Sequence, residues 1–183
     1  MDFDPTNYGP DVARVLALGG NGKRAMPLTC GPCLSEEARQ LLKTFEPAGL
    51  FPEVREPAAP MAGLWLYFSC MEEAHKMIVA SHHRDGQLWH AILHRQEPDS
   101  GNAAYWFRKV GHHPAFHELA HVASAVLERF PDAEFRTGRW DPFAFTAFCE
   151  RARTQPGSMQ ERAAMEIQLA EWQIVFDYTA RPQ

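Results

Sequence analysis

The stretch W-H-A-I-L-H-R-Q-E-P-D-S-G-N-A-A-Y-W-F-R-K-V-G-H-H-P, residues 89–114, decides how this chain is expected to fold. A helix is predicted from about Gly86 to the residue before Pro98, with Asp85 as its N-cap. No helix-breaking residue interrupts the sequence between these positions. After a short break, Asp99 or Ser100 caps a second helix, which ends at a glycine, residue 111. The stretch therefore predicts a helical hairpin rich in aromatic, charged and imidazole side chains.

Start and stop signals of the same kind predict the remaining helices. The expected spans are residues 11–18, a helix capped by Ser35 that Pro47 closes, residues 59–81, residues 114–130, residues 141–153 and a helix from Ser158 to Tyr178. Strand signals are nearly absent. We therefore expect an all-α protein, an irregular bundle of about six to eight helices forming one domain over residues 1–183, with residues 1–34 packed on the body as irregular structure.

Composition and charge narrow the classes of function and partner. The net charge is −5, and the arginines are scattered among acidic residues, which argues against a nucleic-acid partner. The longest apolar run, residues 61–68, is far too short to span a bilayer. The N-terminus lacks the features of a secretory signal, so we expect a cytoplasmic protein whose four cysteines are reduced thiols. The sequence leaves the oligomeric state open, with a homodimer among the options.

Histidine is enriched in this chain, with nine residues in 183. His90, His94 and Glu97 have the i, i+4, i+7 spacing that places side chains near one face of a helix. Two imidazoles one turn apart can bind the same metal ion. The spacing predicts a site for a divalent metal, with Zn, Fe and Mn as candidates.

The preceding helix offers further ligands for that metal. Glu72 and His75 form an E-x-x-H pair, and Glu73 is an alternative carboxylate. Helical bundles assemble metal sites by combining such a pair with residues of a neighbouring helix. We therefore expect His75, His90, His94 and Glu73 as metal ligands.

The arginines of the hairpin suit a small anionic ligand. We expect Arg95 or Arg108 to hold its negative charge and to act with Glu97 in catalysis, because guanidinium groups bind carboxylates and phosphates through two hydrogen bonds. The remaining polar side chains of the pocket are expected to contact the ligand: Asp99, Asn102 and Tyr105. The alternative is a non-catalytic protein in which the same residues form a core network, with Arg95 and Arg108 paired to Glu97 and Asp99.

Two further motifs are weaker candidates for a functional site. Residues 117–121, H-E-L-A-H, match the zinc-peptidase pattern H-E-x-x-H, but no convincing third ligand follows and the sheet of that fold is not predicted. Residues 30–33, C-G-P-C, match a redox motif, but they lack the preceding strand that the thioredoxin fold requires. We interpret both as incidental, with the zinc peptidase kept as a minor alternative.

The central stretch also resembles a known family. The pattern W-H-x-x-x-H-R-x-E-x-D-x-x-N-x-x-Y-W-F-R-x-V-G-x-H-P, with G-L-W-L and E-x-H before it, is similar to that of an uncharacterised family from bacteria and fungi, over residues 61–116. The family has no assigned reaction, so the resemblance implies a shared site without naming its chemistry. Ala74 stands where the family pattern has a serine. The positions implied are His75, His90, His94, Arg95, Glu97, Asp99, Asn102 and Arg108.

Overall fold

The computed structural model describes residues 2–182, and within them the chain is all-helical. Ten α-helices and one 3₁₀ helix account for its regular structure, and these residues form no strand. The N-terminal elements are η1 (Pro5–Tyr8), α1 (Pro10–Ala17), α2 (Glu36–Leu42), α3 (Pro47–Leu50), α4 (Ala58–Tyr67) and α5 (Met71–Ile78). They are followed by α6 (Arg84–Gln96), α7 (Ser100–Val110), α8 (Ala115–Glu128), α9 (Pro142–Arg153) and α10 (Met159–Thr179).

The all-α prediction is confirmed, while the predicted number of helices is too low. The single helix predicted over residues 59–81 is two helices, because the chain turns sharply between α4 and α5, where Ser69 has a φ of 59°. The N–H of Leu34 donates to the carbonyl of Phe68 at 2.8 Å and helps to hold this corner. A second extra helix is α3, which begins at Pro47, the residue that was expected only to close the preceding helix.

Local sequence chemistry explains where several helices begin. The side chains of Ser35, Asp99, Asp141 and Ser158 all accept hydrogen bonds from backbone N–H groups of the following turn. Such N-caps satisfy donors that have no partner inside the helix. The predicted cap of α6 is off by two residues, since His83 and not Asp85 holds the N-cap position.

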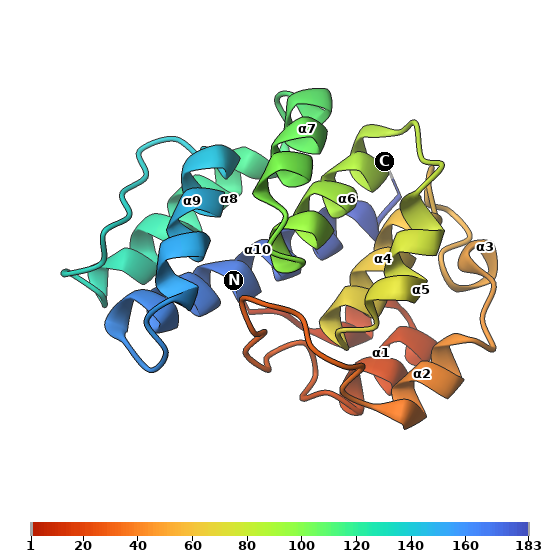
Figure 1. The fold of residues 1–183 in the computed structure, drawn as a ribbon. Helices are drawn as coiled ribbons and strands as arrows, with labels where there is room; N and C mark the ends of the chain where they lie inside the picture. The colour runs from red at the N-terminus through yellow and green to blue at the C-terminus, as the bar shows by residue number, and fades with distance from the viewer. Residues whose placement is uncertain (1, 183) are drawn as a thin grey trace.

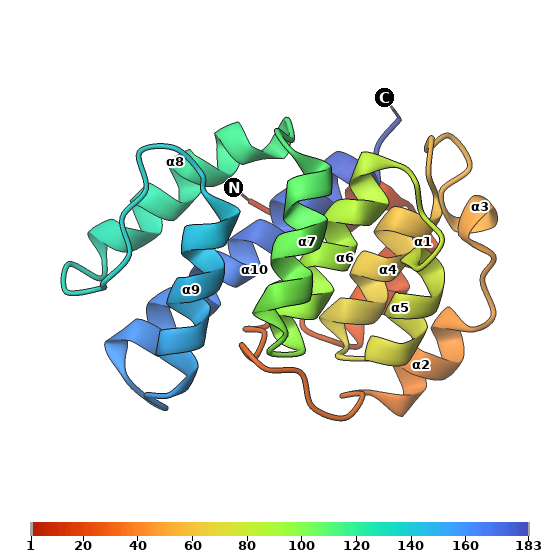
Figure 2. The ribbon, with the colours of Figure 1, turned by 45° about the horizontal axis from the view of Figure 1, so that its top comes forward.

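The helices are arranged around α10, the longest of them. Figures 1 and 2 show α8 and α9 at one end of the molecule and α1 to α5 at the other, with α6, α7 and α10 between them. Helix α10 packs against α4, α8 and α9, and α6 packs closely against α7. No described helix has the length and apolar character needed to cross a membrane.

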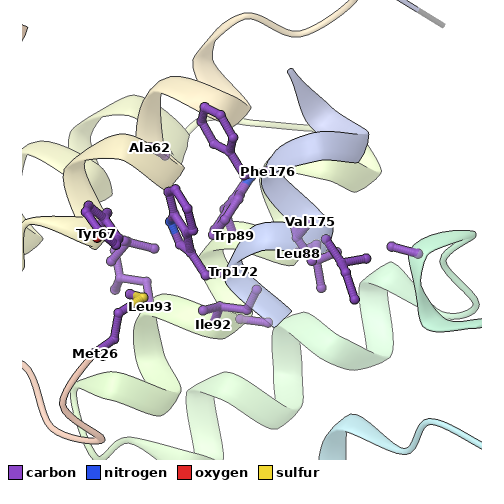
Figure 3. Close-up of a cluster of buried hydrophobic side chains, with 14 of the residues drawn as sticks. Met26, Ala62, Tyr67, Leu88, Trp89, Ile92, Leu93, Trp172, Val175 and Phe176 are labelled. Atoms are coloured by element: carbon purple, nitrogen blue, oxygen red, sulfur yellow. The ribbon is translucent and has the colours of Figure 1, made fainter. Parts of the chain in front are cut away.

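A cluster of large apolar side chains fills the centre (Figure 3). Trp89 of α6 and Trp172 of α10 both lie against α4 at Gly63. The indole N–H of Trp172 donates to the carbonyl of Gly63 at 2.7 Å, and a Cβ added at Gly63 would lie 2.7 Å from the Trp89 ring. The absence of a side chain at this position therefore lets α4 approach both tryptophans.

The N-terminal segment packs on the body, and its cysteines depart from the sequence-based expectation. Cys33 is joined by a disulfide to Cys70, at the start of α5, whereas Cys30 and Cys149 are free thiols. The prediction of four reduced thiols is therefore wrong for two of them. The cytoplasmic location stays a prediction.

Candidate metal centre

Helix α6 directs two imidazoles to one side of the core. Its apolar residues, which include Leu88 and Leu93, face inward, while His90 and His94 occupy a neighbouring face one turn apart. The two rings are stacked, with centroids 4.8 Å apart and planes inclined by 21°. The i, i+4 spacing that was read from the sequence is thus realised as a stacked pair inside the protein.

Helix α5 adds a third imidazole. The ring of His75 lies with its centroid 4.9 Å from that of His90 and 5.7 Å from that of His94. One ring nitrogen from each of the three residues lies within 4.8 Å of the other two. Among residues 2–182, this is the one group of three or more His, Cys, Asp or Glu side chains close enough to hold a metal ion.

His90 is kept neutral by its surroundings. Its side chain is buried, and its ring stacks on that of Trp106 with centroids 4.0 Å apart. Burial, together with repulsion from His94, His75 and Lys109, lowers the pKa of His90 to about 3. The Nδ1 atom of His90 has no hydrogen-bond partner among the described residues, although it is buried. A neutral imidazole with an unsatisfied buried nitrogen is the form that ligates a metal.

His94 is oriented by a carboxylate. Its Nδ1 atom lies 2.8 Å from Oε2 of Glu97 and 3.4 Å from the amide nitrogen of Asn102. Because an ionised carboxylate only accepts hydrogen bonds, Nδ1 carries the proton and donates a hydrogen bond to Glu97. This tautomer leaves a free lone pair on Nε2, the arrangement that commonly accompanies metal-binding histidines.

Three imidazoles of this kind can form an open coordination site. Catalytic zinc sites have three protein ligands and leave the fourth position to water or substrate. Nitrogens of a tetrahedral zinc site lie about 3.3 Å apart. Nitrogens that lie up to 4.8 Å apart here therefore need to approach one another by up to about 1.5 Å. Rotation of the partly exposed His75 ring, on the short helix α5, can supply such a shift.

The structure brings only part of the predicted site together. Besides the three histidines, Glu97 and Asn102 lie at the cluster, and Asp99 lies at the start of α7, where it caps the helix by accepting from the N–H of Asn102 at 3.0 Å. Tyr105 is 47% exposed and contacts the edge of Trp106.

Two of the expected carboxylates are engaged away from the histidines. Glu73 was expected to bind the metal; instead it accepts a hydrogen bond from Nε of Arg39 at 2.7 Å. Glu72, the other half of the E-x-x-H pair, is exposed and faces Lys76. The first coordination sphere offered by the described residues therefore consists of histidines alone.

Neither of the predicted arginines lies at the histidine cluster. Arg95 is fully buried in an ion pair with Glu171 of α10, and its guanidinium lies over the ring of Phe145. Arg108 is exposed and lines a pocket between α7, α8 and α9. The pairing of these arginines with Glu97 and Asp99 that was expected for a core network is therefore wrong.

The two secondary motifs form no comparable cluster. His117 and His121 are exposed on α8 with ring centroids 4.8 Å apart, and no third ligand joins them among residues 2–182. In the C-G-P-C run, Cys30 donates to Gln96 and Cys33 is bonded to Cys70, so the two cysteines of the motif do not pair with each other.

Sequence reasoning missed two neighbours of the cluster. Trp106 is partly buried, and its ring covers that of His90. The ammonium of Lys109 lies 4.9 Å from the centre of the Trp106 ring and adds positive charge beside the cluster. Both residues follow Asn102 at i+4 and i+7 and therefore lie on the same face of α7. This helical spacing could have predicted that they lie beside the cluster.

No protein-family model, no curated protein and no solved structure matches this chain. The resemblance to an uncharacterised family over residues 61–116 therefore stays a prediction.

Proposed function

We propose that this protein is a metalloprotein in which His75, His90 and His94 bind one divalent transition-metal ion. The convergence of three imidazole nitrogens within 4.8 Å carries the proposal. Two properties of the cluster support it: His90 is held neutral, and the proton of His94 is directed toward Glu97, so that lone pairs are free for a metal.

Among the candidate metals, the ligand set fits zinc and disfavours manganese. Imidazole suits Zn, Cu, Fe and Ni, whereas Mn prefers carboxylate and carbonyl oxygens, and both candidate glutamates of α5 are engaged elsewhere. The open fourth position suits a water molecule whose pKa the metal lowers, so the reaction class that fits is metal-assisted hydration or hydrolysis. The positive charge of Lys109 beside the cluster favours a small anionic substrate.

The competing function is a non-catalytic one, in which the histidines only stabilise the fold. The stacking of His90 between Trp106 and His94 favours this alternative, because such packing is typical of a core. It does not explain why the buried Nδ1 atom of His90 lacks a partner. Metal stoichiometry distinguishes the two functions.

The test uses the full chain without a histidine tag, reconstituted with zinc, dialysed and analysed by mass spectrometry for metal content. We expect one zinc per chain in the wild type and a loss of at least tenfold in affinity in His75→Ala and in His94→Ala. The double variant His117→Ala/His121→Ala is the matched control, because it removes an exposed histidine pair with the same spacing. It should keep the full stoichiometry.

Circular dichroism of each variant confirms that it is folded. A wild-type protein that takes up less than a tenth of an equivalent of zinc contradicts the proposal. So does equal zinc content in all variants, since the bound metal then lies at another site.

A further inference from the structure

A pocket of about 890 Å³ opens on the side of α7 that faces away from the histidine cluster. It lies between the second half of α7, the first half of α8 and the segment of residues 138–143 that leads into α9. Asn102 and Trp106 point from α7 toward α6, whereas Phe107 and Arg108 line this pocket. Its volume lies within the range of pockets that hold small organic ligands.

Aromatic side chains from three segments make up the apolar part of the pocket. Phe107, Phe116 and Trp140 are each at most 6% exposed and form its inner wall. Phe143 is 42% exposed at the pocket, with its ring centroid 6.1 Å from that of Phe107. A large apolar side chain left partly open to solvent beside a concave aromatic wall is typical of a ligand site.

The polar part of the same pocket is predominantly cationic. Arg108 and Arg139 are exposed, and within residues 2–182 neither guanidinium has an ion pair or a hydrogen-bond partner. The lining contains a single carboxylate, that of Asp141, whose Oδ1 atom already accepts from the N–H groups of Phe143 and Ala144. Two unpaired guanidiniums are notable in a chain whose net charge is −5.

We propose that this pocket binds a small aromatic carboxylate, with Arg108 and Arg139 holding the anionic group and the aromatic wall holding the ring. Guanidinium groups recognise carboxylates through charge-assisted hydrogen bonds, and stacked or edge-on rings hold aromatic bodies. The H-E-L-A-H run takes on a different meaning in this site. His117 and His121 line the pocket and add hydrogen-bonding groups, so they serve a ligand rather than a zinc ion.

The site is independent of the proposed metal centre, because none of the three metal-binding histidines lines the pocket. A failure of one proposal therefore leaves the other intact.

The proposal is tested by isothermal titration calorimetry of the full chain with 2-naphthoate. Two comparison ligands are used: 2-naphthalenemethanol, a neutral analogue, and acetate, a carboxylate without an aromatic ring. We expect saturable 1:1 binding of naphthoate with a Kd below about 1 mM, and binding of either comparison ligand weaker by at least tenfold. Arg108→Gln/Arg139→Gln should lose at least tenfold in naphthoate affinity, as should Phe143→Ser.

Arg162→Gln is the matched control, because Arg162 is an exposed arginine of α10 outside the pocket. Its naphthoate affinity should equal that of the wild type. The substituted side chains are exposed, so the variants are expected to fold, and thermal melts followed by circular dichroism verify this. Naphthoate binding that is absent from the wild type, unchanged in the double arginine variant or matched by the neutral alcohol overturns the proposal.

Discussion

Arg95 and Glu171 form an ion pair inside the core, with side chains 0% and 1% exposed, that joins α6 to α10. The Nη1 atom of Arg95 donates to Oε1 of Glu171 at 2.9 Å, and a second hydrogen bond joins Nη2 to Oε2. This bidentate geometry compensates for the removal of both charges from water. The pair is part of the fold, and it holds in place the helix that carries His90 and His94.

Removal of one partner of this pair should be strongly destabilising. Arg95→Met leaves the Glu171 carboxylate buried without a counter-ion, and we expect a loss of about 3–5 kcal/mol in the free energy of unfolding. The double variant Arg95→Met/Glu171→Leu removes both charges and should cost less than the single one. Urea denaturation measures both values. A double variant that is less stable than the single variant contradicts this account of the pair.

Gly63→Ala should destabilise the protein even though alanine is the better helix former. A Cβ at this position meets the Trp89 ring at 2.7 Å, and overpacking of this kind costs about 1–3 kcal/mol, more than the gain of up to about 1 kcal/mol in helix propensity. Gly101→Ala in α7 is the control, because its nearest neighbour would be 3.6 Å away. It should leave stability unchanged or raise it in the same urea experiment. Equal effects of the two substitutions would show that close packing at Gly63 is unimportant.

Glu97→Gln should weaken metal binding while preserving the fold. The Glu97 side chain is 42% exposed, so its contribution to stability is small, but it fixes the tautomer of His94. The amide of glutamine accepts this hydrogen bond more weakly than the carboxylate does, and mutation of such a partner typically reduces metal affinity by about 10–100-fold. Competition with a chromophoric zinc chelator measures the affinity. Glu72→Gln on α5 is the control, and similar affinities for the two variants contradict the positioning role of Glu97.

The metal-free protein should lose stability in acid because of His90. The pKa of His90 is lowered from 6.5 to about 3 in the folded chain, so between these values the unfolded chain binds a proton that the folded chain does not. The contribution of His90 to stability is therefore complete above pH 6.5 and falls by up to about 1.4 kcal/mol per pH unit as the pH decreases toward 3. His90→Phe, which keeps a ring against Trp106, should reduce this slope in urea denaturation with chelator present. An unchanged slope would falsify the assignment.

Reduction of the Cys33–Cys70 disulfide should lower stability. The bond closes a loop with a sequence separation of 37, and cross-links of such length contribute about 3–4 kcal/mol in the chain-entropy model. We expect dithiothreitol to lower the free energy of unfolding of the wild type, measured by urea denaturation, by this amount and to leave that of Cys33→Ser/Cys70→Ser unaffected. Thiol alkylation under denaturing, non-reducing conditions should label Cys30 and Cys149 alone. Labelling of all four cysteines is the contrary result.

Signals carried by neighbouring residues in the sequence made much of this fold predictable. The caps at Asp99, Asp141 and Ser158 marked helix starts because a side chain satisfies N–H groups within the same turn. The stacking of His90 and His94 follows from helical spacing in the same way.

Contacts between distant residues escaped prediction. Glu171 lies 76 residues from Arg95, and no local pattern names it as the partner. The corner at Ser69 depends on Leu34, a residue of another segment, so an apolar run predicted an unbroken helix there. The binding of Glu73 to Arg39 of α2 likewise removed an expected metal ligand that helical spacing alone could not exclude.

The position of α10 also bears on how the chain folds during synthesis. Phe3 packs on Trp172, and the hydroxyl of Tyr8 donates to Asp177 at 2.6 Å across a sequence separation of 169 residues. Translation proceeds at about 5–20 residues per second. The N-terminal residues are therefore synthesised on the order of 10 s before their partners in α10. During that interval the nascent chain exposes aromatic surface that α10 covers only after synthesis is nearly finished.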